Sequence, residues 1–281
     1  LVQRIGHGLD ALERERYAAK ARELLDAWAV VNQGVSGGDG RLVMAYVGIA
    51  FVSAAELLGD DPGWSSDARA RFDGWVGRVL RDVATIESRE NNWGSWGVLT
   101  GLASAHWLED ATAFTAHTER LRALIDLQIE PSGELPRETG RGSKGLWYTY
   151  FSLAPLTHAA AIVRRTSGED LFAWQPASGG TLIDALDYFL AAADAAQAPG
   201  SDPSLTPSPS GWGGDLLFAN GHLLDRSAWI AWSRPPFGSS NSAWKTSDLL
   251  VGGFEPGAPS EPAPTSDPPE VGQPGRPGLL R

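Results

Sequence analysis

The sequence predicts an all-α protein, and three observations support this prediction. Apolar residues recur at helical spacing through long segments. Turns rich in Gly and Pro separate these segments, and no stretch alternates apolar and polar residues for long enough to form a sheet. Helices of about 15–25 residues joined by short loops pack as antiparallel hairpins, which stack into a bundle, a solenoid or a closed toroid. Periodicity alone leaves these three architectures open.

The predicted helices follow one another along the chain. They cover residues 9–31, 42–58, 66–83, 96–108, 110–129, 146–165 and 181–196, with a last helix within 212–232. Ser65 or Ser66 should cap the third of these helices. The segment 42–58 is the most apolar, but Ser53 and Glu56 interrupt it, so we expect a buried helix rather than a membrane span. Pro155 should kink or break the helix that contains it.

Composition limits the classes of function. With 281 residues the chain can form one sizeable core, and its formal net charge of −11 argues against nucleic acid as a partner. The chain has no Cys, which excludes disulfides and thiolate metal sites. It begins with Leu and shows no signal peptide, so we expect a processed chain or a fragment. From about Gly252 onward Pro, Gly, Ser and Glu dominate, which predicts a helical domain over 1–252 and a disordered tail over 253–281.

Two short stretches concentrate polar and aromatic side chains at predicted loop-to-helix junctions. They cover residues 90–96 and 136–150. Amides, cations, phenols and indoles at such places suit a polar, ring-shaped ligand, and the twelve Trp of the chain suit a groove that stacks on sugar rings. The same aromatic rings also fit an ordinary hydrophobic core, and the Asn pair at 91–92 also fits a helix cap.

The second stretch carries a cluster of cations close to a phenol. Its members are Arg137, Arg141, Lys144 and Tyr148. Three intervening Gly favour a loop that delivers the cations, with Ser143 capping the helix that follows. A nearby cation stabilises a phenolate, so Tyr148 would be able to act as a base, and Arg suits bidentate binding of a carboxylate. Solvated loop cations beside a core phenol are the alternative interpretation.

Other catalytic patterns are weak or missing. The five His show no metal-ligand spacing, and the sequence contains no phosphate-binding loop or nucleophile elbow. We therefore expect no metal and no cofactor. Glu90, Glu134 and Glu138 include a possible carboxylate pair for a glycoside hydrolase, although many helical proteins contain as many carboxylates.

At the two stretches the sequence resembles the alginate lyase domain family of polysaccharide lyases. The matching segments are Asn91-Asn92-Trp93-Gly94-Ser95-Trp96, then Gly133 to Arg141 in the pattern Gly-x-Leu-Pro-x-Glu-x-x-Arg, then Gly145 to Leu153 with its Tyr pair. With the early helix that contains Lys20, the resemblance spans roughly residues 17–232. It implies an incomplete (α/α) toroid built from antiparallel helical hairpins, and β-elimination on alginate or a related polyuronate.

The resemblance also implies roles for individual residues. Asn92 and Arg141 would neutralise the uronate carboxylate, and Tyr148 would be both base and acid. Substrate binding would fall to Asn91, Trp93, Trp96, Arg137, Lys144, Trp147 and Tyr150. The implied partner is an anionic polysaccharide, not nucleic acid or a membrane, and the implied location is secreted or periplasmic. The oligomeric state stays open.

One position departs from the family pattern. Many relatives carry His directly after the Asn pair, and here that residue is Trp93. Either His106 or His158 supplies an imidazole, or Tyr148 works alone, or the protein is inactive or takes a different uronate. The alternatives to a lyase are a helical-toroid glycoside hydrolase that uses the carboxylates at 134 and 138, and a polysaccharide-binding relative without catalysis.

Overall fold

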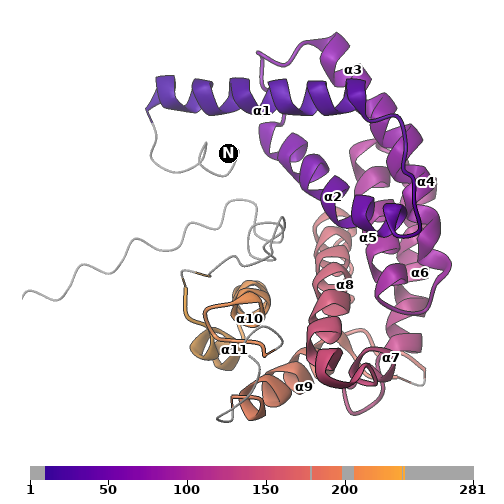
Figure 1. Cartoon of the computed structure of the whole chain (residues 1–281), viewed down its shortest axis with the longest axis vertical. Coiled ribbons are helices and arrows are strands. Elements are labelled where there is room, and N and C mark those ends of the chain that lie inside the picture. Colours follow the sequence, from indigo (N-terminus) through magenta and orange to yellow (C-terminus); the bar gives the residue numbers. More distant parts are fainter. Residues whose placement is uncertain (1–9, 178, 198–205, 236, 238–281) are drawn as a thin grey trace, which may run out of the picture.

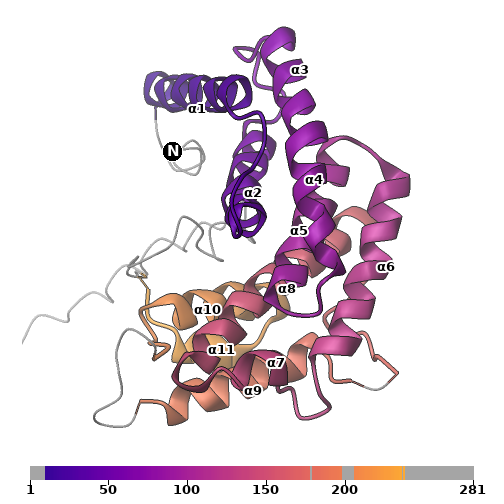
Figure 2. The same cartoon turned by 45° about the vertical axis from the view of Figure 1, so that its right-hand side comes forward.

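The helices curve in an open arc, with α1 (Ala11–Val31) at one end and α10 (Trp212–Leu224) and α11 (Ser227–Trp232) at the other (Figures 1 and 2). This computed structural model describes residues 10–177, 179–197, 206–235 and 237. Every regular element in these residues is a helix or helical turn, which confirms the all-α prediction. The predicted tail over 253–281 lies outside the described residues.

The remaining helices lie between these two ends. They are α2 (Gly40–Leu58), α3 (Ser66–Trp75), α4 (Arg81–Ala84), α5 (Asn92–Trp107), α6 (Ala111–Gln128), α7 (Pro136–Thr139), α8 (Gly145–Ser167) and α9 (Leu182–Ala195). A π-helical turn, Val76–Leu80, joins α3 to α4, and a 3-10 turn, Thr85–Ser88, follows α4.

Side-chain caps explain where several helices start. Asp10, Ser65 and Asp110 each accept a backbone N–H from the first turn of α1, α3 and α6. Thr181 and Asp184 form a reciprocal capping box at α9. The sequence prediction that Ser65 or its neighbour caps the third helix is therefore confirmed.

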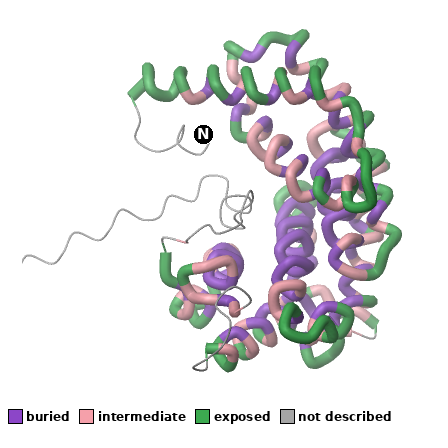
Figure 3. Tube along the Cα trace, in the orientation of Figure 1, coloured by how far each residue is buried: buried purple, intermediate pink, exposed green. Residues whose placement is uncertain are grey.

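The centre of the fold is the pair α5 and α8, which run parallel. The hydroxyl oxygens of Ser95 and Ser152 lie 2.8 Å apart in the N-terminal halves of the two helices, and Thr166 lies 3.3 Å from the His106 ring near the helix ends. Both helices are largely buried, whereas α1 is largely exposed (Figure 3). The N-termini of α5 and α8 therefore open at one end of the fold and their C-termini at the other.

Several features of the helices differ from the sequence prediction. α5 begins at Asn92 rather than at residue 96, because Asn91 caps it there. α8 runs without a break through Pro155, because packing of the buried residues on either side offsets the loss of one backbone N–H. The predicted last helix is two helices, which separate at Asp225, whose φ of 54° lies in the left-handed region.

In the described part of the chain, one helix is long and apolar enough to cross a membrane by length and composition alone. This helix is α2, the same segment that the sequence marks as most apolar. A core helix of a folded domain passes the same test, and α2 buries Met44, Ile49 and Val52 in the hydrophobic core. Burial of these side chains agrees with the prediction of a core helix.

Candidate active site

Two helix N-termini meet where the two sequence motifs lie. The Asn91 side chain caps α5 by accepting the backbone N–H of Trp93 at 3.2 Å, and α8 starts at Gly145 after a 3-10 turn. Ser143 lies in this turn and does not cap α8 as predicted, because the cap position falls on the exposed Lys144. Since α5 and α8 run parallel, their positive dipole ends point to one region, which favours an anionic ligand there.

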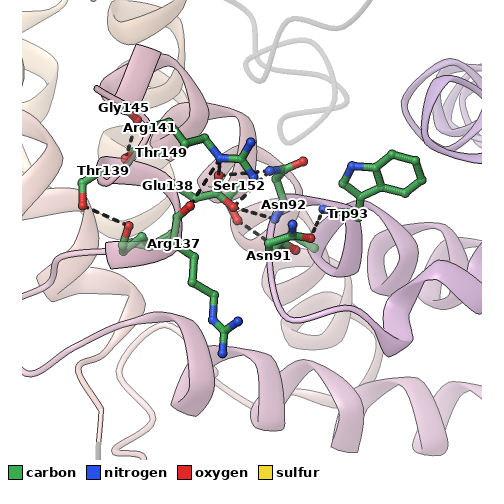
Figure 4. A network of polar contacts seen from close by, with 12 residues as sticks. Asn91, Asn92, Trp93, Arg137, Glu138, Thr139, Arg141, Gly145, Thr149 and Ser152 are labelled. Atoms are coloured by element: carbon green, nitrogen blue, oxygen red, sulfur yellow. Dashed lines mark hydrogen bonds and ion pairs between the residues drawn. The ribbon is translucent and has the colours of Figure 1, made fainter. Parts of the chain in front are cut away.

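Glu138 is a buried carboxylate that ties the two motifs together (Figure 4). It accepts the backbone N–H of Asn92 at 2.7 Å, and the Asn92 side-chain amide lies 3.0 Å from each carboxylate oxygen. Arg141 Nε lies 2.9 Å from Glu138 Oε2. A buried carboxylate is stable only with such donors around it. Glu138 therefore fixes Asn92 and Arg141 relative to each other.

The local sequence explains why Glu138 faces inward. Pro136 occupies the first turn of α7, where a missing N–H is tolerated, and the buried Leu135 anchors the chain just before it. Gly145 allows α8 to start against this turn, because a Cβ at that position would lie 2.6 Å from the Thr139 carbonyl oxygen. The short α7 is therefore held between the core and the start of α8.

Arg141 reaches over the ring of Tyr148. Its guanidinium carbon lies 4.1 Å from the ring centroid, which is within cation–π range, and Trp147 meets the same ring edge-on at 5.0 Å. The Arg141 side chain is 35% exposed, and Tyr148 is half-buried. The predicted cation beside a phenol is thus present, with the guanidinium over the face of the ring.

Polar side chains that the sequence did not indicate form hydrogen bonds between the helices next to this junction. Gln128 Oε1 accepts the hydroxyls of Ser95 at 3.1 Å and Ser152 at 2.8 Å, and Gln128 Nε2 donates to the Asn91 carbonyl at 3.4 Å. This network joins α5, α6 and α8 under the Asn pair. No sequence signal marks it, because each member is an ordinary helical residue and the partners are far apart in the chain.

Cations border an open depression of about 530 Å³ beside the junction. Its walls include Arg89, Glu90, Asn91 and Arg137, and Arg137 Nη2 lies 2.6 Å from Glu90 Oε2. The Arg137 side chain is 54% exposed and turns away from Glu138 (Figure 4). Asn91 and Arg137 are therefore open to a ligand on this surface.

The four predicted aromatic binding residues divide into two pairs. Trp93 and Trp147 are half-buried, and the Arg89 guanidinium lies 4.5 Å from the Trp93 ring centroid. Trp96 and Tyr150 are only 1% and 2% exposed. The prediction that Trp96 and Tyr150 line a substrate groove is wrong, because α5 and α8 turn these two rings into the core.

Asn92 also differs from its predicted role. It is 1% exposed, and both its backbone and side-chain N–H groups point at Glu138. The side-chain oxygen of Asn92, Oδ1, has no hydrogen-bond partner among the described residues. The amide that was expected to meet a substrate carboxylate is therefore engaged by a carboxylate of the protein itself.

Neither His106 nor His158 lies where it could take the place of the His that the family pattern has at the position of Trp93. His158 follows Tyr148 by ten residues in α8, which is about 15 Å along the helix axis. His106 lies in the last turn of α5, about 21 Å along the axis from Asn92. The structure therefore places both His106 and His158 far from the two motifs that contain Asn92 and Tyr148.

His158 should instead make stability depend on pH. Burial, and to a smaller extent the charge of Arg165, lowers the pKa of His158 to about 3, whereas an unfolded His titrates near about 6.5. The unfolded chain binds this proton more readily, so the stability is fully present above about pH 6.5 and is lost as the pH falls towards about 3. At pH 4.5 we expect His158 to lower the free energy of unfolding by about 2–3 kcal/mol.

Urea unfolding at pH 7 and pH 4.5 checks this prediction. His158→Leu removes the titrating group, so the variant should lose less stability than the parent protein between the two pH values. The other titrating groups are common to both proteins, so the difference isolates His158. Equal losses in the two proteins would contradict the assignment.

The geometry does not favour the glycoside hydrolase alternative. Glu138 is 1% exposed and surrounded by its own donors, and Glu134 accepts the Thr139 hydroxyl at 2.5 Å. Glu90 is paired with Arg137. An acid and a base for glycoside hydrolysis must both reach the sugar, and these carboxylates are engaged by the protein. No group of three or more His, Asp or Glu that could hold a metal ion occurs among the described residues.

Comparison with solved structures defines the class of fold. A variant of alginate lyase A1-III in complex with a tetrasaccharide matches with a TM-score of 0.69 at 17% identity, over 83% of this chain and 71% of that one. An alginate lyase from Bacteroides ovatus matches with a TM-score of 0.57 at 16% identity, over 76% of this chain and 57% of that one. The likeness shows an α/α toroid, which confirms the predicted fold class.

Sequence comparison then gives the family. The alginate lyase family model matches residues 5–199, well over half of the chain, so the protein belongs to the alginate lyase family. A polysaccharide lyase from Stenotrophomonas maltophilia is 36% identical over 113 residues, which are 37% of this chain and 32% of that protein. The resemblance seen at the two motifs is therefore confirmed at the level of the family.

Proposed function

We propose that this protein cleaves a polyuronate by β-elimination. The observation that carries the proposal is the contact of Arg141 with Tyr148 at the paired N-termini of α5 and α8. Removal of a proton beside a carboxylate needs positive charge next to a base, because negative charge builds up on the carboxylate in the transition state. A guanidinium, two helix dipoles and a phenol at one half-exposed place meet this requirement.

The reaction would take place at C5 and C4 of one uronate. Arg141 and the helix dipoles neutralise the carboxylate on C5, which stabilises the enolate-like transition state. The Tyr148 oxygen takes the C5 proton as the base, the electron pair forms the C4–C5 double bond, and the C4–O4 bond breaks. Tyr148 then returns the proton to the departing O4, which restores the base for the next turnover.

The remaining site residues would hold the reacting groups and the chain. Glu138 and Asn92 act through Arg141, whose position they fix, so we assign Asn92 a positioning role rather than direct binding of the uronate. Trp93 and Trp147 are half-buried indoles on which sugars would stack. Local cations at this surface would let a protein of net charge −11 bind an acidic polymer.

A single proton-transfer group restricts the stereochemistry of the substrate. Tyr148 serves both C5–H and O4 only if the two lie on the same face of the sugar, because proton transfer needs heavy-atom distances of about 2.6–3.2 Å. D-mannuronate and D-glucuronate have this arrangement, whereas L-guluronate carries its C5 proton on the opposite face. Since Trp93 stands where an imidazole would otherwise face the substrate, we propose that D-mannuronate or D-glucuronate units are cleaved.

Ultraviolet absorbance tests the reaction class. Elimination leaves a conjugated double bond at the new chain end, so absorbance should rise with time when the protein is mixed with alginate or glucuronan. A rise in reducing ends without new absorbance would indicate hydrolysis. Binding of the polymer without any product would indicate a non-catalytic relative, and either result would overturn the proposal.

A further inference from the structure

A second cavity, of about 770 Å³, lies at the opposite end of the α5 and α8 pair. It is bordered by the C-terminal turns of α2, α5 and α8 and by the start of α6, with Glu56, His106 and Arg165 among its lining residues. α5 has 16 residues, so the cavity is separated from the Asn pair by about 24 Å of helix. This size is typical of sites for sugar-sized or drug-sized ligands.

Glu56 is a partly exposed carboxylate without a full set of partners. Its side chain is 27% exposed and lines the cavity, while its Oε1 atom is shielded and has no hydrogen-bond partner among the described residues. The nearest cations are His106 Nε2 at 3.9 Å from Oε1 and Arg165 Nη2 at 3.6 Å from Oε2. Both distances exceed a hydrogen bond. Burial raises the pKa of Glu56, and the charges of His106 and Arg165 oppose this rise.

Arg165 is the cation beside Glu56, and its side chain is accessible from solvent. Its side chain is 51% exposed, and Glu56 is the one ion-pair partner that the described structure gives it. The other charged side chains on the wall are engaged or peripheral. Arg69 bonds to Asp60 and lies over the Trp107 ring, and Asp110 is paired with Arg81 and caps α6, while Glu109 is exposed.

The cavity therefore places a hydrogen-bond acceptor, the Glu56 carboxylate, beside a side chain with several N–H donors, Arg165. A carboxylate that lacks a donor is satisfied by a hydroxyl, and a guanidinium binds a carboxylate through two parallel hydrogen bonds. A ligand that carries hydroxyls next to a carboxylate meets both needs at once. Trp107 and Phe114 on the same wall add apolar surface for the face of a ring.

We propose that this cavity is a second binding site for a uronate sugar, separate from the proposed site of elimination. The uronate carboxylate binds Arg165, and a ring hydroxyl donates to Glu56. A binding site here would let the protein hold the end of a uronate chain or a released sugar on the face away from the reaction. The inference does not depend on catalysis at Tyr148.

Isothermal titration calorimetry with sodium D-glucuronate tests the proposal on the full chain. D-glucose serves as the uncharged comparison, and we expect its binding to be at least about tenfold weaker, because it lacks the carboxylate. Arg165→Gln and Glu56→Gln should each weaken D-glucuronate binding about tenfold or more. Arg165→Lys, which keeps the charge but not the paired N–H geometry, should fall between.

Two control variants separate this cavity from the proposed active site. Arg164→Gln changes the neighbouring side chain of α8, which does not line the cavity, and should bind as the parent protein does. Arg141→Gln should remove only the contribution of the proposed site of elimination, so the binding that depends on Arg165 should persist in this variant. Binding that is lost in Arg141→Gln but kept in Arg165→Gln, or the absence of saturable binding in the parent protein, would overturn the proposal. Circular dichroism confirms that each variant is folded, and elimination by Arg165→Gln should equal that of the parent.

Discussion

Tyr148→Phe should lower the rate of elimination by about 10²–10⁴-fold while it leaves polymer binding nearly unchanged. The substitution removes one hydroxyl, the group proposed to accept the C5 proton and to return it to O4. The ring stays, so its contacts with Arg141 and Trp147 persist. The initial rise in ultraviolet absorbance gives the rate, and calorimetric titration with an oligouronate that is not turned over by the variant gives the affinity.

A matched control makes this result specific. Tyr17→Phe removes a hydroxyl from α1, at the far end of the arc, and should keep full activity. A loss of rate in both variants would indicate a general effect on folding. Retention of more than about a tenth of the activity in Tyr148→Phe would contradict the assignment of Tyr148 as the proton-transfer group.

Glu138→Gln should have the second largest effect, on both activity and stability. The neutral amide replaces a carboxylate that holds the Arg141 guanidinium and the Asn92 amide. The NH₂ group of the new Gln is itself a donor, so it cannot accept the hydrogen bonds that these N–H groups donate. We expect a loss of about 1–3 kcal/mol in the free energy of unfolding. We also expect a fall in rate of about a hundredfold at a temperature where the variant is folded, because Arg141 is no longer fixed.

Glu134→Gln is the comparison for this variant. Glu134 accepts a single hydroxyl, from Thr139, and lies in the same segment. Its substitution should change stability by less than about 1 kcal/mol and leave elimination intact. Thermal unfolding and the absorbance assay measure both quantities. A Glu138→Gln protein with unchanged melting and unchanged rate would show that the buried carboxylate does not organise the site.

The sequence predicted those parts of the structure that depend on local pattern. Helix periods placed the main helices, and Ser65 was recognised as a cap because capping acts over three residues. The motif at 136–150 placed Arg141 near Tyr148 because only seven residues separate them, so a turn and the start of a helix suffice to bring them together.

Tertiary packing decided the features that the sequence could not predict. Trp96 and Trp93 are close in one motif, yet one ring is in the core and the other borders the site, since the direction in which α5 faces depends on α8 and α6. Glu138 appeared within the family pattern and as a weak glycosidase candidate, without a role in holding Asn92. Its partner Asn92 lies 46 residues away, and no local pattern records that pairing. The same holds for Gln128 with Ser152.

The rates of elimination on polymannuronate and polyguluronate test the central claim most directly. Both polymers carry the same charge, so the comparison isolates the face of the ring on which the C5 proton lies. Because Tyr148 is proposed to work without an imidazole partner, absorbance should rise with polymannuronate and stay flat with polyguluronate, and Tyr148→Phe should remove the rise. Equal or faster cleavage of polyguluronate would contradict a mechanism with one proton-transfer group.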